Sequence, residues 1–377
     1  MTKFIIRRSL GLVPLLLLVV VFSFLLMKAA PGGPEAQFQG NKKISQVQID
    51  AWLKRWCLQP TDANTPILEQ VGNYFVEFGG WFGILNCNRS GSQAFFSDSG
   101  GLNVLPPALG GGSNGVIHGD LGYGIQSGRP VTEIIAERIP ATFILAFTAL
   151  VLWVSIAIVL GVYAAIHRYS LFDQTVTFLS YIFYSLPTFW LGLNLIFIFG
   201  VALRWFPTGG IITTRDWSPF NTPQYWQQFG ANPGAATLDI GRHLFLPVLT
   251  LVAVNIAGDS RFVRASMLES INQDYVRTAR AKGLRNRVVV GKHALRNAML
   301  PVVTNVALEI PFLFSGAIVT ETIFNWPGMG RLFIDSIGGK DYFVIMGLLL
   351  VTAIITLFAN LIADVVYAIV DPRIRYD

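Results

Sequence analysis

The sequence has little charge, almost no cysteine and few histidines. Only 13% of its 377 residues are charged, whereas about a quarter is usual for a soluble domain. Cys57 and Cys87 are too few for a disulfide framework and too far apart for a zinc knuckle. The four histidines are scattered and form no cluster with cysteine. These absences argue against a soluble enzyme, a disulfide-stapled domain and a metal site, and they point to a protein embedded in lipid.

Sequence motifs of enzymes are also missing. The chain has no GxxxxGK[ST] loop to cradle ATP and no HExxH. The segment "SIGGKD" at 336–341 resembles a phosphate loop, but it lacks the upstream glycine and the final Ser or Thr. We therefore expect no catalytic residue, no metal and no cofactor bound by this chain itself. Its energy must then come from an ion gradient or from a partner.

Long apolar runs are what the sequence does contain. A membrane helix needs about 20 mostly apolar residues, and six stretches qualify. The fourth is the weakest because it carries Asn255 and Asp259, which we expect to face a helix bundle or a polar path. The first resembles a signal peptide, but its apolar run is longer than usual, so we expect it to be retained. The predicted spans are roughly 9–27, 141–166, 176–203, 244–262, 298–320 and 343–370.

Positive charge predicts the orientation of these spans. Between the fourth and fifth spans, eight Arg or Lys residues stand against two acidic residues, a net charge of +6 that equals the charge of the whole chain. Basic residues also occur in both terminal tails and between the second and third spans, all on one side of a six-helix path. Cytoplasmic loops are enriched in Lys and Arg. We therefore expect both termini in the cytoplasm, contact with membrane lipid, and no nucleic acid partner.

The opposite side carries a long polar insert. Residues 31–137 contain both cysteines and are rich in Gly, Ser and Asn near their middle. If this side is oxidising, Cys57 and Cys87 could form a disulfide; two free thiols are the alternative. The chain then divides into a tail with the first helix (1–30), the extracytoplasmic insert (31–137), and a core with the other five helices (138–377). The core includes a cytoplasmic loop at about 264–297.

The cytoplasmic loop has an internal order of its own. "SINQ" at 270–273 predicts a capping box, followed by a short helix from about Ile271 to Lys282. Gly283 is placed to end that helix in the left-handed conformation. Small residues there would let another protein approach closely. Two interpretations remain: a basic loop that lies against anionic lipid headgroups, or a docking helix for a cytoplasmic protein.

Several segments also resemble a known family. "DYVRTARAKGL", "KHALRNAMLP", "ETIFNWPGMGRL", "KDYFVIMG" and "NLIADVVYAIVDPRIR" are similar, in order, to signatures of the dipeptide/oligopeptide/nickel family of ABC-transporter permeases. "IIRRSLGLVPLLLLV" with "APGGP" resembles the start of the first, B-type, permease subunit. The resemblance runs from Phe4 to Arg375, although the insert at about 35–117 is longer than in common members.

This resemblance implies a fold and a set of partners. The fold would be an all-α integral membrane protein of six transmembrane helices with a type I ABC importer permease (MetI-like) core. The partners would be a second homologous permease subunit, an extracytoplasmic solute-binding protein and two cytoplasmic ATPases that bind ATP and Mg. The location would be the bacterial or archaeal plasma (inner) membrane.

The resemblance also implies a coupling helix that docks on an ATPase. In the wider superfamily this loop begins Glu-Ala-Ala, with a glycine four residues after the second alanine. Gly283 and Ala279 match that pattern, but Arg277 and Thr278 replace the Glu and the first Ala, so the acidic contact is not carried over. The expected contact residues are Tyr275, Arg277, Thr278, Ala279, Lys282 and Gly283.

Other polar residues in the core are candidates for a translocation path or a gate. Glu309 lies two residues before Pro311, within the fifth span. A carboxylate there faces a partner or a watery path, and we group it with Asn255 and Asp259 as path residues; a structural pair with a neighbouring helix is the alternative. The turn sequence at 325–330 follows the fifth span on the outer side. Glu321, Pro327 and Gly328 are expected there as an outer gate or loop.

The predicted function is uptake of di- or oligopeptides by an ATP-driven importer, with this chain as one permease subunit. One alternative is a secondary transporter driven by an ion gradient through Glu309 and Asp259. Another is the same importer class with nickel, a glutathione-like molecule or a sugar as its solute. A non-transport membrane anchor for a sensor is a third possibility.

Overall fold

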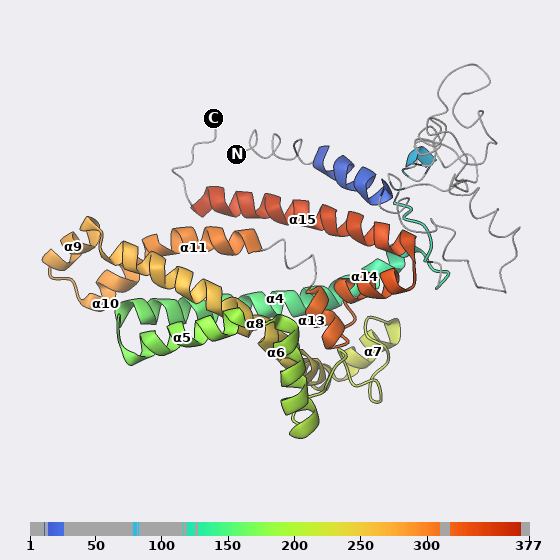
Figure 1. Cartoon of the computed structure of the whole chain (residues 1–377), viewed down its shortest axis with the longest axis horizontal. Helices are drawn as coiled ribbons and strands as arrows, with labels where there is room; N and C mark the ends of the chain where they lie inside the picture. Colours follow the sequence, from blue (N-terminus) through green and yellow to red (C-terminus); the bar gives the residue numbers. More distant parts are fainter. Residues whose placement is uncertain are drawn as a thin grey trace, which may run out of the picture. The chain divides into compact units, whose positions relative to one another are not determined.

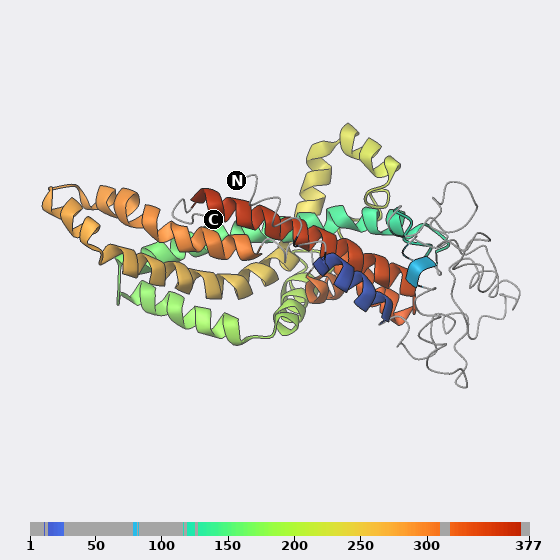
Figure 2. The same ribbon diagram turned by 90° about the horizontal axis from the view of Figure 1, so that it is seen from above.

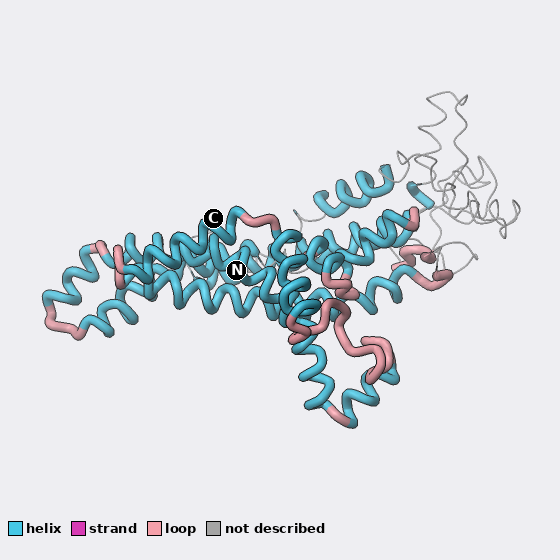
Figure 3. The backbone as a smooth tube through the Cα atoms, turned by 60° about the horizontal axis from the view of Figure 1, so that its bottom comes forward, coloured by secondary structure: helices cyan, strands magenta, loops and turns pink. Residues whose placement is uncertain are grey.

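The computed structural model describes residues 11, 14–25, 78–80, 82, 116, 119–124, 127–309 and 317–370, with side chains to 365. Cys57, Cys87 and most of the predicted 31–137 insert lie outside these ranges, so the disulfide stays a prediction. Every regular element of the described part is a helix, apart from one isolated bridge between Tyr123 and Pro130 (Figure 3).

The α-helices from α4 to α15 are labelled in Figure 1. Their bounds are α4 Val131–Ile166, α5 Leu171–Ser185, α6 Thr188–Leu195, η5 Ile196–Ala202, α7 Pro223–Ala231, α8 Pro233–Ile271, α9 Asp274–Ala281, α10 Asn286–Val288, η6 Val289–Ala294, α11 Leu295–Glu309, α13 Ile318–Ile323, α14 Met329–Gly338 and α15 Tyr342–Val370. A shorter apolar helix, Pro14–Leu25, precedes them.

Three described helices are long and apolar enough to cross a membrane: α4, α8 and Tyr342–Val365 of α15. The pair formed by α5 with α6 and η5 is a fourth span if it crosses as one bent unit. Only part of the first and fifth predicted spans is described, because residues 26–77 and 310–316 are not. The described part is thus helical with three or four candidate membrane spans, while the count of six stays a prediction.

The third predicted span, 176–203, is not one straight helix. It bends by 100° between α5 and α6. Leu186 has φ −82° and ψ 131°, which is extended, and Pro187 follows it. The ring of a proline disfavours helical backbone at the preceding residue and removes one N–H donor, so the helix stops there. The apolar run was correctly identified, but the expectation of a continuous helix was wrong.

Two other spans are longer than the sequence suggested. Helix α4 begins at Val131, ten residues before the expected start, so the last part of the polar insert is helical. Helix α8 covers Pro233–Ile271, whereas only 244–262 was expected. Its first turn has Pro233 at the start and Asn232 as a cap whose side chain accepts from the Ala235 N–H, a combination that favours helix initiation. A search of the sequence for apolar runs does not detect the polar ends of helices such as α4 and α8.

The chain divides into two compact units, which we describe separately. One unit comprises 1–11, 138–332 and 354–377; the other comprises 12–137 and 333–353. In the second unit α15 packs closely on the start of α4, since a Cβ added at Gly347 would lie 2.6 Å from Val131 Cγ1. The first unit holds all the candidate site residues discussed below.

Helices α5, α8 and α11 run side by side in the first unit, with α8 between the other two (Figure 2). The α5–α8 contact contains an ion pair: Arg264 Nε lies 2.6 Å from Asp173 Oδ1, and Arg264 Nη2 lies 2.8 Å from Oδ2. Helices α4 and α8 meet at Gly161, where an added Cβ would lie 2.6 Å from the Ser260 carbonyl oxygen. These contacts fix α8 as the central helix of the unit.

Candidate functional site

The loop after α8 contains the short helix that the sequence predicted. Helix α9 has eight residues and follows α8 after a two-residue break, Asn272 and Gln273. Gly283 has φ +73°, and its N–H donates to the Arg280 carbonyl over 3.0 Å. The left-handed helix stop at Gly283 is therefore confirmed. The predicted capping box is wrong, because Ser270 still belongs to α8 and Gln273 at the start of α9 makes no side-chain cap bond.

One face of α9 packs against the chain's own core. Val276 is fully buried and Ala279 nearly so. They contact Met267 of α8 and the buried side chains of Val289 and Ala294 in η6. Ala279, expected as a partner contact, therefore lies against this chain itself. Burial of these apolar side chains is what holds α9 in place.

The opposite side of α9 is exposed and basic. Arg277, Thr278, Lys282 and Gly283 are all exposed, and Tyr275 is 40% exposed. Arg277 makes an ion pair with Asp274 at 3.4 Å, but both side chains are largely in solvent, where such a pair adds little stability. Six exposed basic side chains between 280 and 296 have no acidic partner among the described residues: Arg280, Lys282, Arg285, Arg287, Lys292 and Arg296.

Two serines of α8 bond to carbonyl groups at the end of this loop and in α11, and neither role was expected from the sequence. Ser266 Oγ donates to the Ala298 carbonyl over 2.7 Å. Ser270 Oγ donates to the Ala294 carbonyl over 2.7 Å and lies 2.7 Å from the hydroxyl of Tyr275. Ser266 and Ser270 are four residues apart, on one helical face. That spacing is the only sequence signal, and it does not say which carbonyl each serine meets.

A second polar group lies between α4, α8 and α11. Trp153 Nε1 donates to Asp259 Oδ2 over 3.1 Å, and the Asn305 amide donates to both Asp259 (3.3 Å) and Glu309 (3.2 Å). Glu309 Oε2 is buried and has no hydrogen-bond partner. The structure thus joins two of the three predicted path residues. Two carboxyl groups so close repel when both are charged, so the group suits a proton or a cationic ligand.

Asn255 does not belong to this group. Its amide donates to the Leu251 carbonyl of the same helix over 2.7 Å, and its side chain is exposed. Trp153 and Asn305, in contrast, were not singled out from the sequence. Asn305 lies four residues before Glu309, a helical spacing that could have indicated it. Within the described ranges, no three His, Cys, Asp or Glu side chains converge to hold a metal ion.

The predicted outer loop folds around a buried carboxylate. Glu321 is fully buried. Its Oε1 accepts from the Thr142 hydroxyl at 2.9 Å, and its Oε2 accepts from the Arg331 N–H at 3.1 Å, in the first turn of α14. Burial raises the pKa of Glu321 above its ordinary value, while the Arg331 and Thr142 hydrogen bonds oppose that rise. A carboxylate at a helix N-terminus satisfies free N–H groups and complements the helix dipole.

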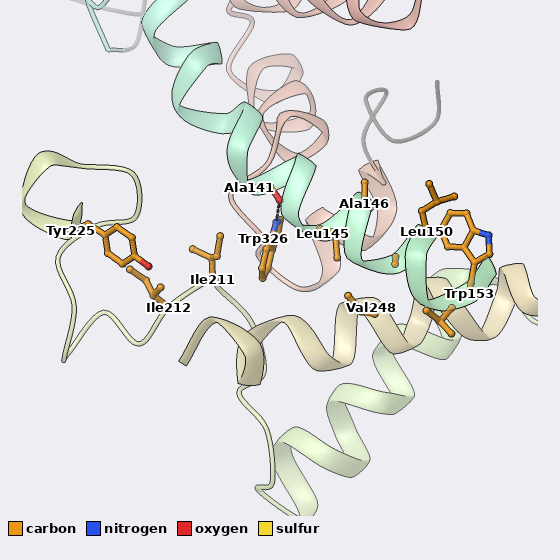
Figure 4. Close-up of a cluster of buried hydrophobic side chains, with 12 residues drawn as sticks. Ala141, Leu145, Ala146, Leu150, Trp153, Ile211, Ile212, Tyr225, Val248 and Trp326 are labelled. Atoms are coloured by element: carbon orange, nitrogen blue, oxygen red, sulfur yellow. Dashed lines mark hydrogen bonds between the residues drawn. The ribbon is translucent and has the colours of Figure 1, made fainter. Parts of the chain in front are cut away.

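The rest of this loop is built to enclose Glu321. Gly328 is buried, and a Cβ there would overlap the Glu321 carboxylate. Trp326 is fully buried and its indole N–H donates to the Ala141 carbonyl over 2.8 Å (Figure 4). Pro327 is half-buried between them. We call Thr142, Glu321, Trp326, Gly328 and Arg331 the Glu321 joint, because together they tie the loop to α4. A gating role for Glu321, Pro327 and Gly328 stays a prediction.

Comparison with known proteins identifies the family. The profile of the family described as "Binding-protein-dependent transport system inner membrane component" matches residues 157–376. That range includes α8, α9, α11 and most of the Glu321 joint.

Individual relatives extend the similarity over the whole chain. The oligopeptide transport system permease protein AppB of Bacillus subtilis (strain 168) is 38% identical over 377 residues, the full length of both chains. The glutathione transport system permease protein GsiC of Escherichia coli O6:H1 is 34% identical over 376 residues, again 100% of each chain. The dipeptide transport system permease protein DppB of E. coli K12 is 40% identical over 271 residues, 70% of this chain and 78% of its own length.

The structure has several candidate membrane spans and a short helix, α9, that lies between two longer helices in the sequence. The profile match covers more than half of the chain. The chain therefore belongs to the binding-protein-dependent transport system inner membrane components, the permease components of ABC transporters.

Proposed function

We propose that this chain is one transmembrane subunit of an ATP-driven importer for di- or oligopeptides in a bacterial or archaeal plasma membrane. A second homologous permease subunit completes the pathway, and a solute-binding protein delivers the peptide from outside. Two cytoplasmic ATPases bind ATP and Mg and supply the energy. The names of relatives such as the oligopeptide permease AppB and the dipeptide permease DppB support the substrate class.

Helix α9 is the observation that carries this proposal. It is short, ends at a left-handed glycine, and is fixed by Val276 and Ala279 to the core of its own chain. Its other side is exposed and basic: the ion pair of Arg277 with Asp274 lies in solvent, and Arg280 has no acidic partner in the described part of the chain. A surface of this kind can bind in an acidic or polar groove of another protein, and a movement of that protein then displaces α9 together with α8 and α11. Tyr275, Arg277, Thr278, Lys282 and Gly283 are the proposed contacts.

The mechanism follows from these connections. ATP binding closes the ATPase pair and brings the two docked helices together. Since α9 is packed on α8 and η6, that displacement moves the cytoplasmic ends of α8 and α11 and turns the pathway outward. Peptide enters from the binding protein, and hydrolysis restores the inward state. Asp259 and Glu309 lie along the path, where a carboxylate can attract the ammonium group of a peptide.

Reconstitution tests the proposal directly. The chain is placed in vesicles with the second permease, both ATPases and the binding protein, and uptake of labelled trialanine is measured. Uptake is expected only when ATP, the ATPases and the binding protein are all present. Uptake by this chain alone would contradict the proposal.

A gradient-driven transporter is the second candidate, because Asp259 and Glu309 form a carboxyl pair that could carry a proton. Such a transporter would continue to take up trialanine after ATP depletion and would stop when a protonophore is added. The ATP-driven importer behaves in the opposite way. The same vesicles therefore distinguish the two candidates.

A further inference from the structure

The hydroxyl of Tyr275 is hydrogen-bonded to Ser270 of the same chain. Tyr275 is 40% exposed, yet its hydroxyl lies 2.7 Å from Ser270 Oγ, and Ser270 is only 6% exposed. Ser270 has one hydroxyl hydrogen, and the Ala294 carbonyl at 2.7 Å can only accept. That hydrogen therefore goes to Ala294. The Tyr275 hydroxyl must then be the donor to Ser270.

The two hydrogen bonds, from Tyr275 to Ser270 and from Ser270 to Ala294, run in one direction and connect three helical elements. This chain of bonds begins at Tyr275 in the first turn of α9, passes through Ser270 in the last turn of α8, and ends at Ala294, the last residue of η6. Among the described residues, α9 is also held to the core by apolar contacts of Val276 and Ala279. Apolar contacts resist separation but set no direction, whereas hydrogen bonds weaken steeply when their angle changes.

We propose that the hydroxyl chain from Tyr275 through Ser270 to Ala294 fixes the angle of α9, so that α9, α8 and η6 move together when an ATPase displaces α9. Tyr275 and Ser270 are then positioning residues. Without these two hydrogen bonds, α9 can rotate on its apolar face about the two-residue link at 272–273. ATP would still be hydrolysed, but less of each displacement would reach α8. This inference rests on the proposed ATP-driven function.

The reconstituted complex with trialanine as probe allows a direct test. The quantity measured is the number of ATP molecules hydrolysed per trialanine imported. Ser270→Ala removes both bonds, and Tyr275→Phe removes one oxygen while it keeps the ring. Both variants are expected to raise this ratio at least threefold. Ser270→Thr supplies a hydroxyl at the same position and should return the ratio to that of the wild type.

Ser266→Ala is the matched control. Ser266 makes an equivalent bond from α8 to the Ala298 carbonyl at 2.7 Å, but it has no link to α9. Its removal should therefore leave the ratio unchanged. A wild-type ratio in Ser270→Ala or Tyr275→Phe would overturn the proposal, and so would an equal rise in Ser266→Ala. If Ser270→Ala does not assemble, Tyr275→Phe decides the question, because it removes only the hydroxyl group.

Failure of this inference can be told from failure of the proposed function. If the wild-type complex shows no ATP-dependent uptake, the proposed function is wrong. If the wild type couples ATP to uptake and both variants do so equally well, only the positioning role is wrong.

Discussion

The α9 loop (residues 272–294) and the Glu321 joint use charge in opposite ways. Around α9 the charged side chains are exposed, and buried apolar residues hold the helix. In the Glu321 joint the side chain of Glu321 is fully buried, and Gly328 leaves no room beside its carboxylate. A buried carboxylate is costly to disturb, whereas an exposed cation is free to meet another protein. The comparison indicates a surface that meets a partner in the first case and a fixed joint in the second.

The largest effect is expected at Gly328. In Gly328→Ala the new Cβ would overlap the Glu321 carboxylate, so the carboxylate must move and its hydrogen bonds must break. Overpacking combined with lost buried hydrogen bonds should lower the free energy of unfolding by about 3 kcal/mol. Thermal unfolding in detergent measures this change.

Gly230 provides the control for Gly328. It lies in α7, and nothing stands within 4 Å of an added Cβ. Gly230→Ala should be neutral or stabilise the protein by about 0.5 kcal/mol, since alanine favours helix. Equal destabilisation by the two variants would show that the loop does not depend on the space beside Glu321.

Removal of the carboxylate should have the next largest effect. Glu321→Ala leaves the Thr142 hydroxyl and the Arg331 N–H without their buried acceptor, which should cost about 2 kcal/mol of unfolding free energy. Unfolding temperatures of the two proteins give the difference. A variant as stable as the wild type would mean that the joint is held by Trp326 alone.

The pH dependence of stability separates the charge of Glu321 from its shape. Its folded-state pKa is raised above the ordinary 4.5, so the folded protein binds a proton more tightly than the unfolded chain does. The contribution of Glu321 to the free energy of unfolding is then complete below about pH 4.5 and is lost as the pH rises through the folded-state pKa. The free energy of unfolding of Glu321→Gln should lack this part of the pH dependence. If wild type and Glu321→Gln differed in unfolding free energy by the same amount at pH 7 and at pH 5, the prediction would be contradicted.

The two regions also differ in how far the sequence predicts them. The stop of α9 was predictable, because the left-handed conformation of Gly283 depends only on local backbone sterics. The spans α4 and α15 were predictable from apolar runs. The Glu321 joint was not, since Glu321 finds its partner Thr142 179 residues away in sequence. Ser270 was misjudged for the same reason: a local capping bond was expected, and a carbonyl 24 residues away took its place.

At Gly283 the effect on coupling should exceed the effect on stability. Gly283→Val forces a β-branched residue to φ +73°, which costs about 1–2 kcal/mol locally. The end of α9 should deform to relieve this strain, so ATP hydrolysis should continue while trialanine uptake falls at least fivefold. The measurement is ATP hydrolysed per peptide in reconstituted vesicles. Normal coupling in this variant would remove α9 from the coupling path.

The smallest effect on stability is expected at Arg277, and it tests the comparison most sharply. Its side chain is exposed and its ion pair with Asp274 is solvated, so Arg277→Ala should change the free energy of unfolding of the isolated chain by about 0.5 kcal/mol or less. Binding of the ATPases should weaken nonetheless, because a cation at their interface is lost. A titration of the purified permease pair with ATPase measures that loss, and unfolding of the chain alone measures the stability. If Arg277→Ala destabilised the isolated chain as much as Glu321→Ala does, the α9 loop would be a second fixed joint, and its exposed cations would serve this chain instead of a partner.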